Sequence, residues 1–104
     1  QLAVPMILSG AKGLISVIGN AIPKKCSLMV NYALEDNIDK AKLCQNEILN
    51  LIEMIFSEGN PTGIKALMSI LGFCKNELRL PLVSASDDLV DKLKKEIISY
   101  KGFQ

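Results

Sequence analysis

The chain has 104 residues, which is enough for one modest hydrophobic core. Apolar residues make up 49% of it and charged residues 22%, and this ordinary globular composition excludes an intrinsically disordered chain. The net charge is +1, from 12 basic and 11 acidic residues, so no excess of one sign would attract nucleic acid or an anionic membrane surface.

Several kinds of site are disfavoured by what the chain lacks. It contains no histidine, which is the commonest general base and the commonest metal ligand. The three cysteines, Cys26, Cys44 and Cys74, lie far apart and form no CxxC pair, so neither a zinc site nor a disulfide framework is indicated. We expect reduced, packed thiols in a cytosolic protein, with no metal and no cofactor.

The first part of the chain, from Leu2 to Ile22, is strongly apolar. Pro5, Lys12 and several glycines and serines interrupt it, and no basic start precedes it, so it does not predict a membrane span or a signal peptide. The spacing instead predicts a short helix over residues 2–9.

Residues 14–18, Leu-Ile-Ser-Val-Ile, form a short β-branched run between Gly13 and Gly19. Near-continuous apolar runs of this length are typical of strands buried on both faces in parallel sheets. From Pro23 onwards the chain reads almost entirely as helices, so this strand would find no partner within the chain. We therefore expect the rest of its sheet to lie outside the chain. The first residue is Gln1 rather than Met, which also indicates a piece of a larger protein.

Apolar residues at helical spacing predict most of the remaining structure. Such stripes predict one helix over residues 23–34 and a longer one over residues 38–57. Asn60 and Pro61 would then be the N-cap and first residue of a third helix, which Gly72 would end.

The last part of the chain predicts a connector followed by a final helix. Pro81 disfavours helix at Leu80, so residues 79–82 are expected to be extended. Residues 84–88, Ser-Ala-Ser-Asp-Asp, are a dense helix-start signal, and the helix that follows should close at Gly102. The expected fold class is therefore mostly α.

No set of residues assembles into a self-sufficient active site. The serines have no histidine to activate them, so lysine is the nucleophile to weigh, because a desolvated lysine can form a Schiff base. Lys12 precedes the strand, whereas chemistry in an α/β barrel lies at the carboxyl ends of strands. Lys24 and Lys25 open a helix, and we expect them to be solvated. Lys65, just inside the third helix, is a candidate for a specific contact.

Three motifs along the chain resemble those of one known protein family. Residues 10–23, Gly-Ala-Lys-Gly-Leu-Ile-Ser-Val-Ile-Gly-Asn-Ala-Ile-Pro, resemble the eighth barrel strand and following loop of the dihydrodipicolinate synthase family. Residues 58–65 resemble that family's Asn-Pro helix opening, and residues 78–82, Leu-Arg-Leu-Pro-Leu, its C-terminal signature. Their order and spacing match over essentially the whole chain.

The resemblance implies the last βα unit of a TIM (β/α)8 barrel followed by a helical C-terminal domain. Residues 1–35 would be the end of the barrel, with its short helix, eighth strand and eighth helix, and residues 36–104 the appended domain. A TIM barrel takes about 250 residues, so most of the barrel would be missing. Ile15 is the one substrate-binding position implied, because its main chain would line the pyruvate pocket.

The resemblance also implies an activity for the full-length parent. The family condenses pyruvate with aspartate semialdehyde through a lysine Schiff base on the sixth strand, a step of lysine and diaminopimelate biosynthesis. The sixth strand and the earlier strands of the barrel would lie outside this chain. No catalytic residue is therefore expected here, and the fragment itself should be inactive. The parent is expected to be a cytoplasmic homo-oligomer, often a tetramer, needing neither nucleic acid nor membrane.

Two alternatives stay open. Where the family often has Asn-Pro-Ile-Pro-Val-Lys, residues 60–65 read Asn-Pro-Thr-Gly-Ile-Lys, and a glycine within a helix costs about 1 kcal/mol against alanine. A sister pyruvate-dependent aldolase such as N-acetylneuraminate lyase is therefore possible. The other alternative is a stand-alone helical interaction module, which an initiator Met immediately upstream of Gln1 would favour. An unpaired apolar strand is a template for pairing, so we expect the isolated chain to self-associate.

Overall fold

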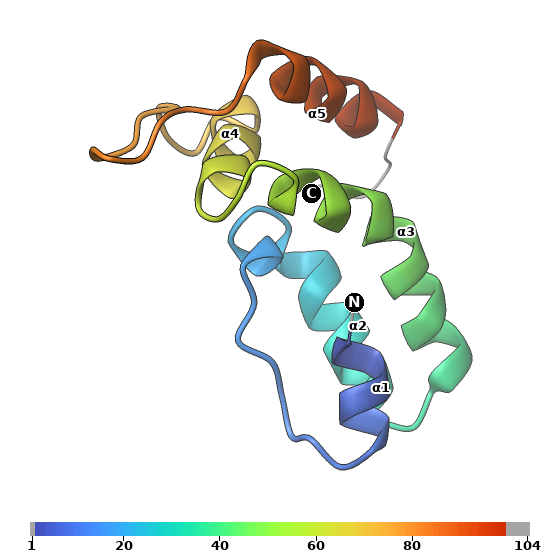
Figure 1. The fold of residues 1–104 in the computed structure, drawn as a ribbon. Helices are drawn as coiled ribbons and strands as arrows, with labels where there is room; N and C mark the ends of the chain where they lie inside the picture. Colours follow the sequence, from blue (N-terminus) through green and yellow to red (C-terminus); the bar gives the residue numbers. More distant parts are fainter. Residues whose placement is uncertain (1, 100–104) are drawn as a thin grey trace. The chain divides into compact units, whose positions relative to one another are not determined.

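The computed structural model describes residues 2–99 and consists of two compact units (Figure 1). One unit extends to Asn50 and the other begins at Leu51, within one long helix, and each is described here by itself. Within the described residues all regular secondary structure is helical, as the mostly α expectation required.

The first unit contains the short helix α1 (Ala3–Leu8), a 3-10 turn η1 (Ile18–Asn20), helix α2 (Pro23–Leu34) and the first part of α3 (Ile38–Phe56). The predicted helices over 23–34 and 38–57 are therefore confirmed. Their inward stripes and α1 supply the core, whose buried residues are Val4, Ile7, Ile18, Ala21, Ile22, Cys26, Met29, Ala33, Ala41, Cys44 and Ile48.

Two polar contacts join the helices of this unit. The backbone N–H of Val4 donates to Oε1 of Gln45 over 3.2 Å, which satisfies a donor that the start of α1 leaves free. Lys25 on α2 forms an ion pair with Glu47 on α3. The expectation that Lys25 is solvated is therefore wrong, because the packing of α2 along α3 brings a carboxylate to its ammonium group.

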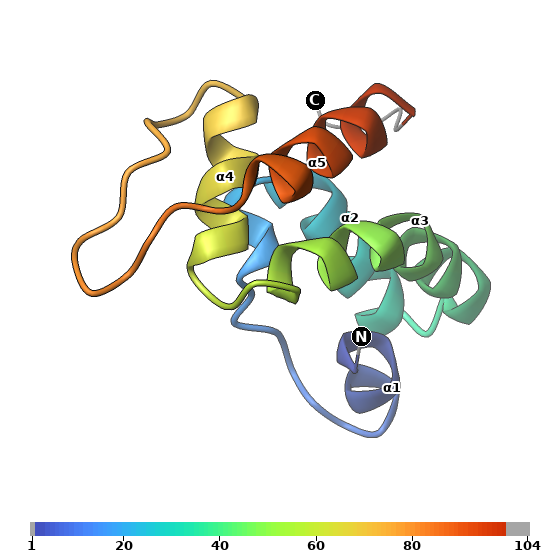
Figure 2. The ribbon, with the colours of Figure 1, turned by 45° about the horizontal axis from the view of Figure 1, so that its top comes forward.

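As expected for a strand with no partner in the chain, residues 14–18 pair with no strand among the described residues. Residues 11–16 have no regular secondary structure, and Ile18 belongs to η1. In both views the segment leaves α1 and reaches η1 with no strand beside it (Figures 1 and 2). Leu14 is 43% exposed and Ile15 fully exposed, so burial on both faces is not observed. The physical reason is that a strand needs a hydrogen-bonded neighbour, and the described residues supply none.

The second unit contains the end of α3, helix α4 (Thr62–Ile70) and helix α5 (Asp87–Ser99). Its buried residues are Leu51, Ile55, Thr62, Gly63, Ile64, Ala66, Leu67, Leu89 and Leu93. A Cβ added to Gly63 would lie 1.9 Å from the carbonyl oxygen of Ile55. Only glycine therefore allows the start of α4 to approach the α3 backbone this closely, and the unusual glycine in a helix has a packing reason.

The ends of α4 test two predictions about capping. The helix begins at Thr62 with Pro61 at the N-cap, so the assignment of Asn60 as the cap is wrong by one residue. Backbone carbonyls close the first turn instead, because the N–H of Gly63 donates to Gly59 O over 3.2 Å. Gly72 ends the helix as expected, with φ at +86°, and its N–H donates to Ser69 O.

The segment between α4 and α5 is held by its own hydrogen bonds. Residues 79–82 form a turn rather than an extended connector, because the N–H of Leu82 donates to Arg79 O over 3.0 Å. The hydroxyl of Thr62 donates to Val83 O over 3.3 Å, and that of Ser84 to Asn76 O over 3.1 Å.

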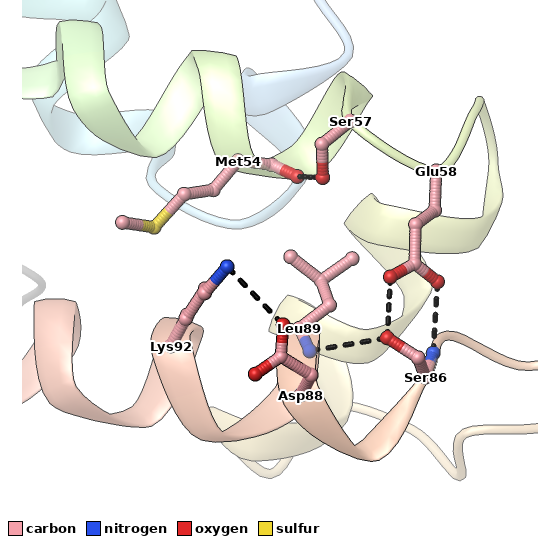
Figure 3. A network of polar contacts seen from close by, with 7 residues as sticks. All are labelled: Met54, Ser57, Glu58, Ser86, Asp88, Leu89 and Lys92. Atoms are coloured by element: carbon pink, nitrogen blue, oxygen red, sulfur yellow. Dashed lines mark hydrogen bonds and ion pairs between the residues drawn. The ribbon is translucent and has the colours of Figure 1, made fainter.

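Ser86 is the N-cap residue that starts α5 (Figure 3). Its hydroxyl accepts the backbone N–H of Leu89 over 3.2 Å and donates to the carboxylate of Glu58, while its own N–H donates to Glu58 Oε1 over 2.8 Å. The predicted helix start is therefore confirmed. The expected end at Gly102 lies outside the described residues.

Candidate functional site

The substrate-binding position that the family resemblance implies, Ile15, lies in the unpaired segment between α1 and η1. Its side chain is fully exposed, while the next residue, Ser16, is partly buried against α2. Leu14, the residue before Ile15, is also exposed, so buried and exposed residues do not alternate along this segment.

Ser16 fixes the turn that follows this segment. The backbone N–H of Gly19 donates to Ser16 Oγ over 3.0 Å, so the hydroxyl holds the chain as it enters η1. On the other side Ser16 Oγ lies 3.9 Å from Cys26 Sγ on α2, within reach of a weak hydrogen bond in which either atom can donate. A single hydroxyl thus ties the segment to α2.

Cys26 is a buried thiol rather than a reactive one. Burial raises its pKa above the ordinary value, and the hydrogen bond with Ser16 lowers it to a lesser extent. A raised pKa keeps the sulfur protonated at neutral pH, and the protonated form is a poor nucleophile. Cys44 is also buried, Cys74 is partly buried, and all three cysteines are free thiols in the structure.

A pocket of about 430 Å³ lies between this segment and α2. Its lining combines apolar groups with the hydroxyls and amides of small polar residues, and consists of Leu14, Ser16, Gly19, Asn20, Pro23, Cys26, Ser27, Val30 and Asn31. No charged residue is in that lining. The pocket can therefore accommodate neutral side chains or a small neutral group, but it offers no acid, base or cation for chemistry.

The lysines considered as nucleophiles do not form a site. Lys12 and Lys24 are exposed, Lys25 is bound to Glu47, and Lys65 is half-buried in α4. Within residues 2–99, no group of three or more cysteine, aspartate or glutamate side chains is placed to hold a metal ion. Among the helices that the structure describes, none is long and apolar enough to cross a membrane.

Sequence reasoning missed the roles of Ser16 and Cys26. Ser16 was weighed only as a nucleophile without a base, although a serine three residues before a glycine is a signal for a side chain that closes a turn. Cys26 is expected from the sequence to be a packed thiol, but its contact with Ser16 depends on tertiary packing and has no signal in the sequence.

Comparison with known proteins gives a consistent family. The model of the "Dihydrodipicolinate synthetase family" matches residues 1–100 of this chain. A 4-hydroxy-tetrahydrodipicolinate synthase of Flavobacterium psychrophilum is 45% identical over 93 residues, which are 89% of this chain and 32% of that protein. The chain thus spans about a third of the length of the curated relatives that it matches.

Solved structures agree with the sequence match. Dihydrodipicolinate synthase from Thermotoga maritima superposes with a TM-score of 0.90 at 32% identity, covering 94% of this chain and 33% of that one. The chloride-inhibited enzyme from Acinetobacter baumannii, complexed with pyruvate, superposes with a TM-score of 0.86 at 33% identity, covering 93% and 33%. The fold of the described residues is therefore that of a part of these larger proteins.

Proposed function

The chain belongs to the dihydrodipicolinate synthetase family, and we propose that it is the C-terminal third of a lyase that condenses pyruvate with aspartate semialdehyde. The observation that carries the proposal is the family match over residues 1–100 combined with coverage of only 32% of a full-length relative. The activity then belongs to the whole protein, and this chain contributes part of its scaffold.

In the proposed arrangement, residues 14–18 are the last strand of a TIM barrel. Residues 1–35 end the barrel and residues 36–104 form the appended helical domain, with the boundary at the turn before α3. The segment's unpaired backbone and the exposed Ile15 beside a partly buried Ser16 support this reading, because a barrel supplies both neighbouring strands and an interior. The main chain at Ile15 would then line the pyruvate pocket.

The proposed chemistry needs a lysine that this chain does not supply. The amine of a lysine in the remainder of the protein attacks the pyruvate ketone, and loss of water gives an imine. Loss of a proton from the methyl group gives an enamine, whose carbon attacks the aldehyde of the second substrate. In this proposal the residues of this chain position the last strand of the barrel and exclude water from the pyruvate pocket. None of them is a catalytic residue.

The setting of the reaction is part of the proposal. We place the full-length protein in the cytoplasm as a homo-oligomer, with pyruvate and aspartate semialdehyde as its small-molecule partners. A relative complexed with pyruvate supports the first substrate. The free thiols agree with a reducing compartment, and the described helices include no candidate membrane span.

The full-length protein provides the test. Borohydride treatment in the presence of pyruvate should add one reduced pyruvate to a lysine outside residues 1–104, and the protein should consume pyruvate and aspartate semialdehyde together. The 104-residue chain is the matched control and should show neither result. A full-length protein that traps no pyruvate contradicts the proposal. Trapping with turnover of another aldehyde, such as N-acetylmannosamine, would assign the sister lyase activity instead.

A further inference from the structure

The second unit carries an exposed apolar loop between α4 and α5 that its own helices do not cover. Within residues 73–83, here called the projecting loop, four large apolar side chains are exposed, at 61% for Phe73, 87% for Leu80, 40% for Leu82 and 70% for Val83. Both views show the loop extending away from α4 and α5 (Figures 1 and 2). Apolar groups that gather on one surface feature mark an interaction site.

The backbone of the projecting loop is nevertheless held in place. A turn joins Arg79 and Leu82, and the hydroxyls of Thr62 and Ser84 bind carbonyls at Val83 and Asn76. The apolar side chains are therefore presented from a fixed backbone. A loop held in this way loses little conformational entropy when a partner covers it.

A polar group in the same loop also lacks a partner. The side-chain oxygen Oδ1 of Asn76 is buried and accepts no hydrogen bond within the described residues. A buried acceptor of this kind costs free energy unless a donor reaches it. That oxygen is enclosed by atoms of this chain, so it says nothing about an outside surface; the four exposed apolar side chains alone indicate that the surface covering the projecting loop is apolar.

We propose that the projecting loop docks on the part of the same polypeptide that lies outside these 104 residues. The inference rests on the proposed function, which makes the chain one third of a longer protein. The remaining two thirds are then available in the same molecule, so docking costs no loss of translational freedom. A second copy is the weaker candidate, because a stable interface involves about 20 to 30 residues a side and this loop offers four exposed apolar side chains.

Photo-cross-linking in the full-length protein tests which surface the projecting loop docks on. A photoreactive benzoylphenylalanine replaces Leu80, and a mixture of isotopically light and heavy protein separates cross-links within a chain from those between chains. We expect products within one chain, to residues outside 1–104. Cross-links between chains, cross-links only to residues of the second unit, or no cross-link would each overturn the proposal. The same group at Ile98, which is 84% exposed on α5, is the control.

A second measurement covers the case in which the photoreactive variant fails to fold. In the full-length protein the double variant Leu80→Ser, Val83→Ser should lower the urea midpoint, whereas Ile98→Ser should leave it unchanged. Equal midpoints for the two variants would overturn the proposal. Failure of the proposed function is read separately, because cross-linking within one chain without pyruvate trapping leaves the docking intact and rejects only the lyase.

Discussion

The two long non-helical segments of the molecule are held in different ways. Within the described residues, none of residues 12–16 in the first unit forms a backbone–backbone hydrogen bond, and Ile15 is fully exposed. The segment between α4 and α5 has a turn at residues 79–82, bonds to Thr62 and a cap at Ser86. Both segments expose apolar side chains, but the first is held to its own unit through the hydroxyl of Ser16, whereas several backbone and side-chain hydrogen bonds hold the second.

The difference shows which residues determine the structure of each segment. The second unit closes with interactions between residues that are near one another in the fold, such as the contact between Glu58 and Ser86 (Figure 3). The first unit presents an irregular segment, residues 11–16, that neighbouring strands would pair in the barrel that we propose. A segment of this kind is complete only within the longer protein that we propose.

The largest expected effect comes from a charge at Ile15. In the full-length protein Ile15→Asp should cost about 3 kcal/mol or more, because the proposed barrel interior would hold an unpaired carboxylate. In the 104-residue chain the same substitution should leave stability almost unchanged, since the side chain is fully exposed there. Urea unfolding of the two proteins measures both values. An equal loss of stability in the two proteins would contradict the claim that the rest of the polypeptide buries Ile15.

A smaller loss is expected where α4 approaches α3. Gly63→Ala should destabilise the protein by about 1 to 3 kcal/mol, because the added Cβ meets the carbonyl of Ile55 and the helices must separate. Gly13→Ala is the matched control, since a Cβ there meets nothing within 4 Å, and it should be nearly neutral. Urea unfolding compares the two. A neutral Gly63→Ala would show that the close approach does not hold in solution.

The cap of α5 gives the next effect. Ser86→Ala should cost about 1 kcal/mol, because the N–H of Leu89 loses its acceptor and Glu58 loses the hydroxyl donor, while the backbone N–H of residue 86 still donates to Glu58. Ser69→Ala within α4 serves as the control and should be neutral or slightly stabilising, since alanine has the higher helix propensity. Thermal unfolding separates the two variants, and equal melting temperatures would contradict the role of the cap.

The smallest effect concerns pH. Hydrogen bonds from the hydroxyl and then the N–H of Ser86 lower the pKa of Glu58 below its ordinary value of 4.5. The contact therefore adds stability above pH 4.5, and that stability is lost as the pH falls through the lowered pKa. Glu58→Gln should remove this part of the pH dependence of the urea midpoint, and Glu35→Gln should retain it. If both variants show the same pH dependence as the unsubstituted protein, the contact between Glu58 and Ser86 does not contribute to it.

Features decided by local chemistry could be predicted from the sequence. The helix over Pro23–Leu34 was predicted to the residue, because proline suits a first helical turn and the apolar stripe has one period. Gly72 was likewise predicted to end its helix, and the start of the last helix was predicted within residues 84–88, where the structure shows Ser86 as the cap.

Features that depend on contacts between residues distant in the sequence could not be predicted. The ion pair of Lys25 depends on the register of α2 against α3, and the start of α4 depends on the close approach at Gly63. The run over residues 14–18 indicated a buried strand without a partner in the chain, and Ile15 is exposed with no strand beside it among the described residues. The role of Ile15 in binding pyruvate stays a prediction.

Hydrogen exchange of the segment before η1 tests the central claim most directly. The amides of Leu14, Ile15 and Val17 are followed by mass spectrometry in the full-length protein and in the 104-residue chain. If these residues are the last strand of a barrel, their amides exchange slowly in the full-length protein and rapidly in the chain alone. Equally rapid exchange in both proteins would contradict the claim that the rest of the polypeptide completes this segment.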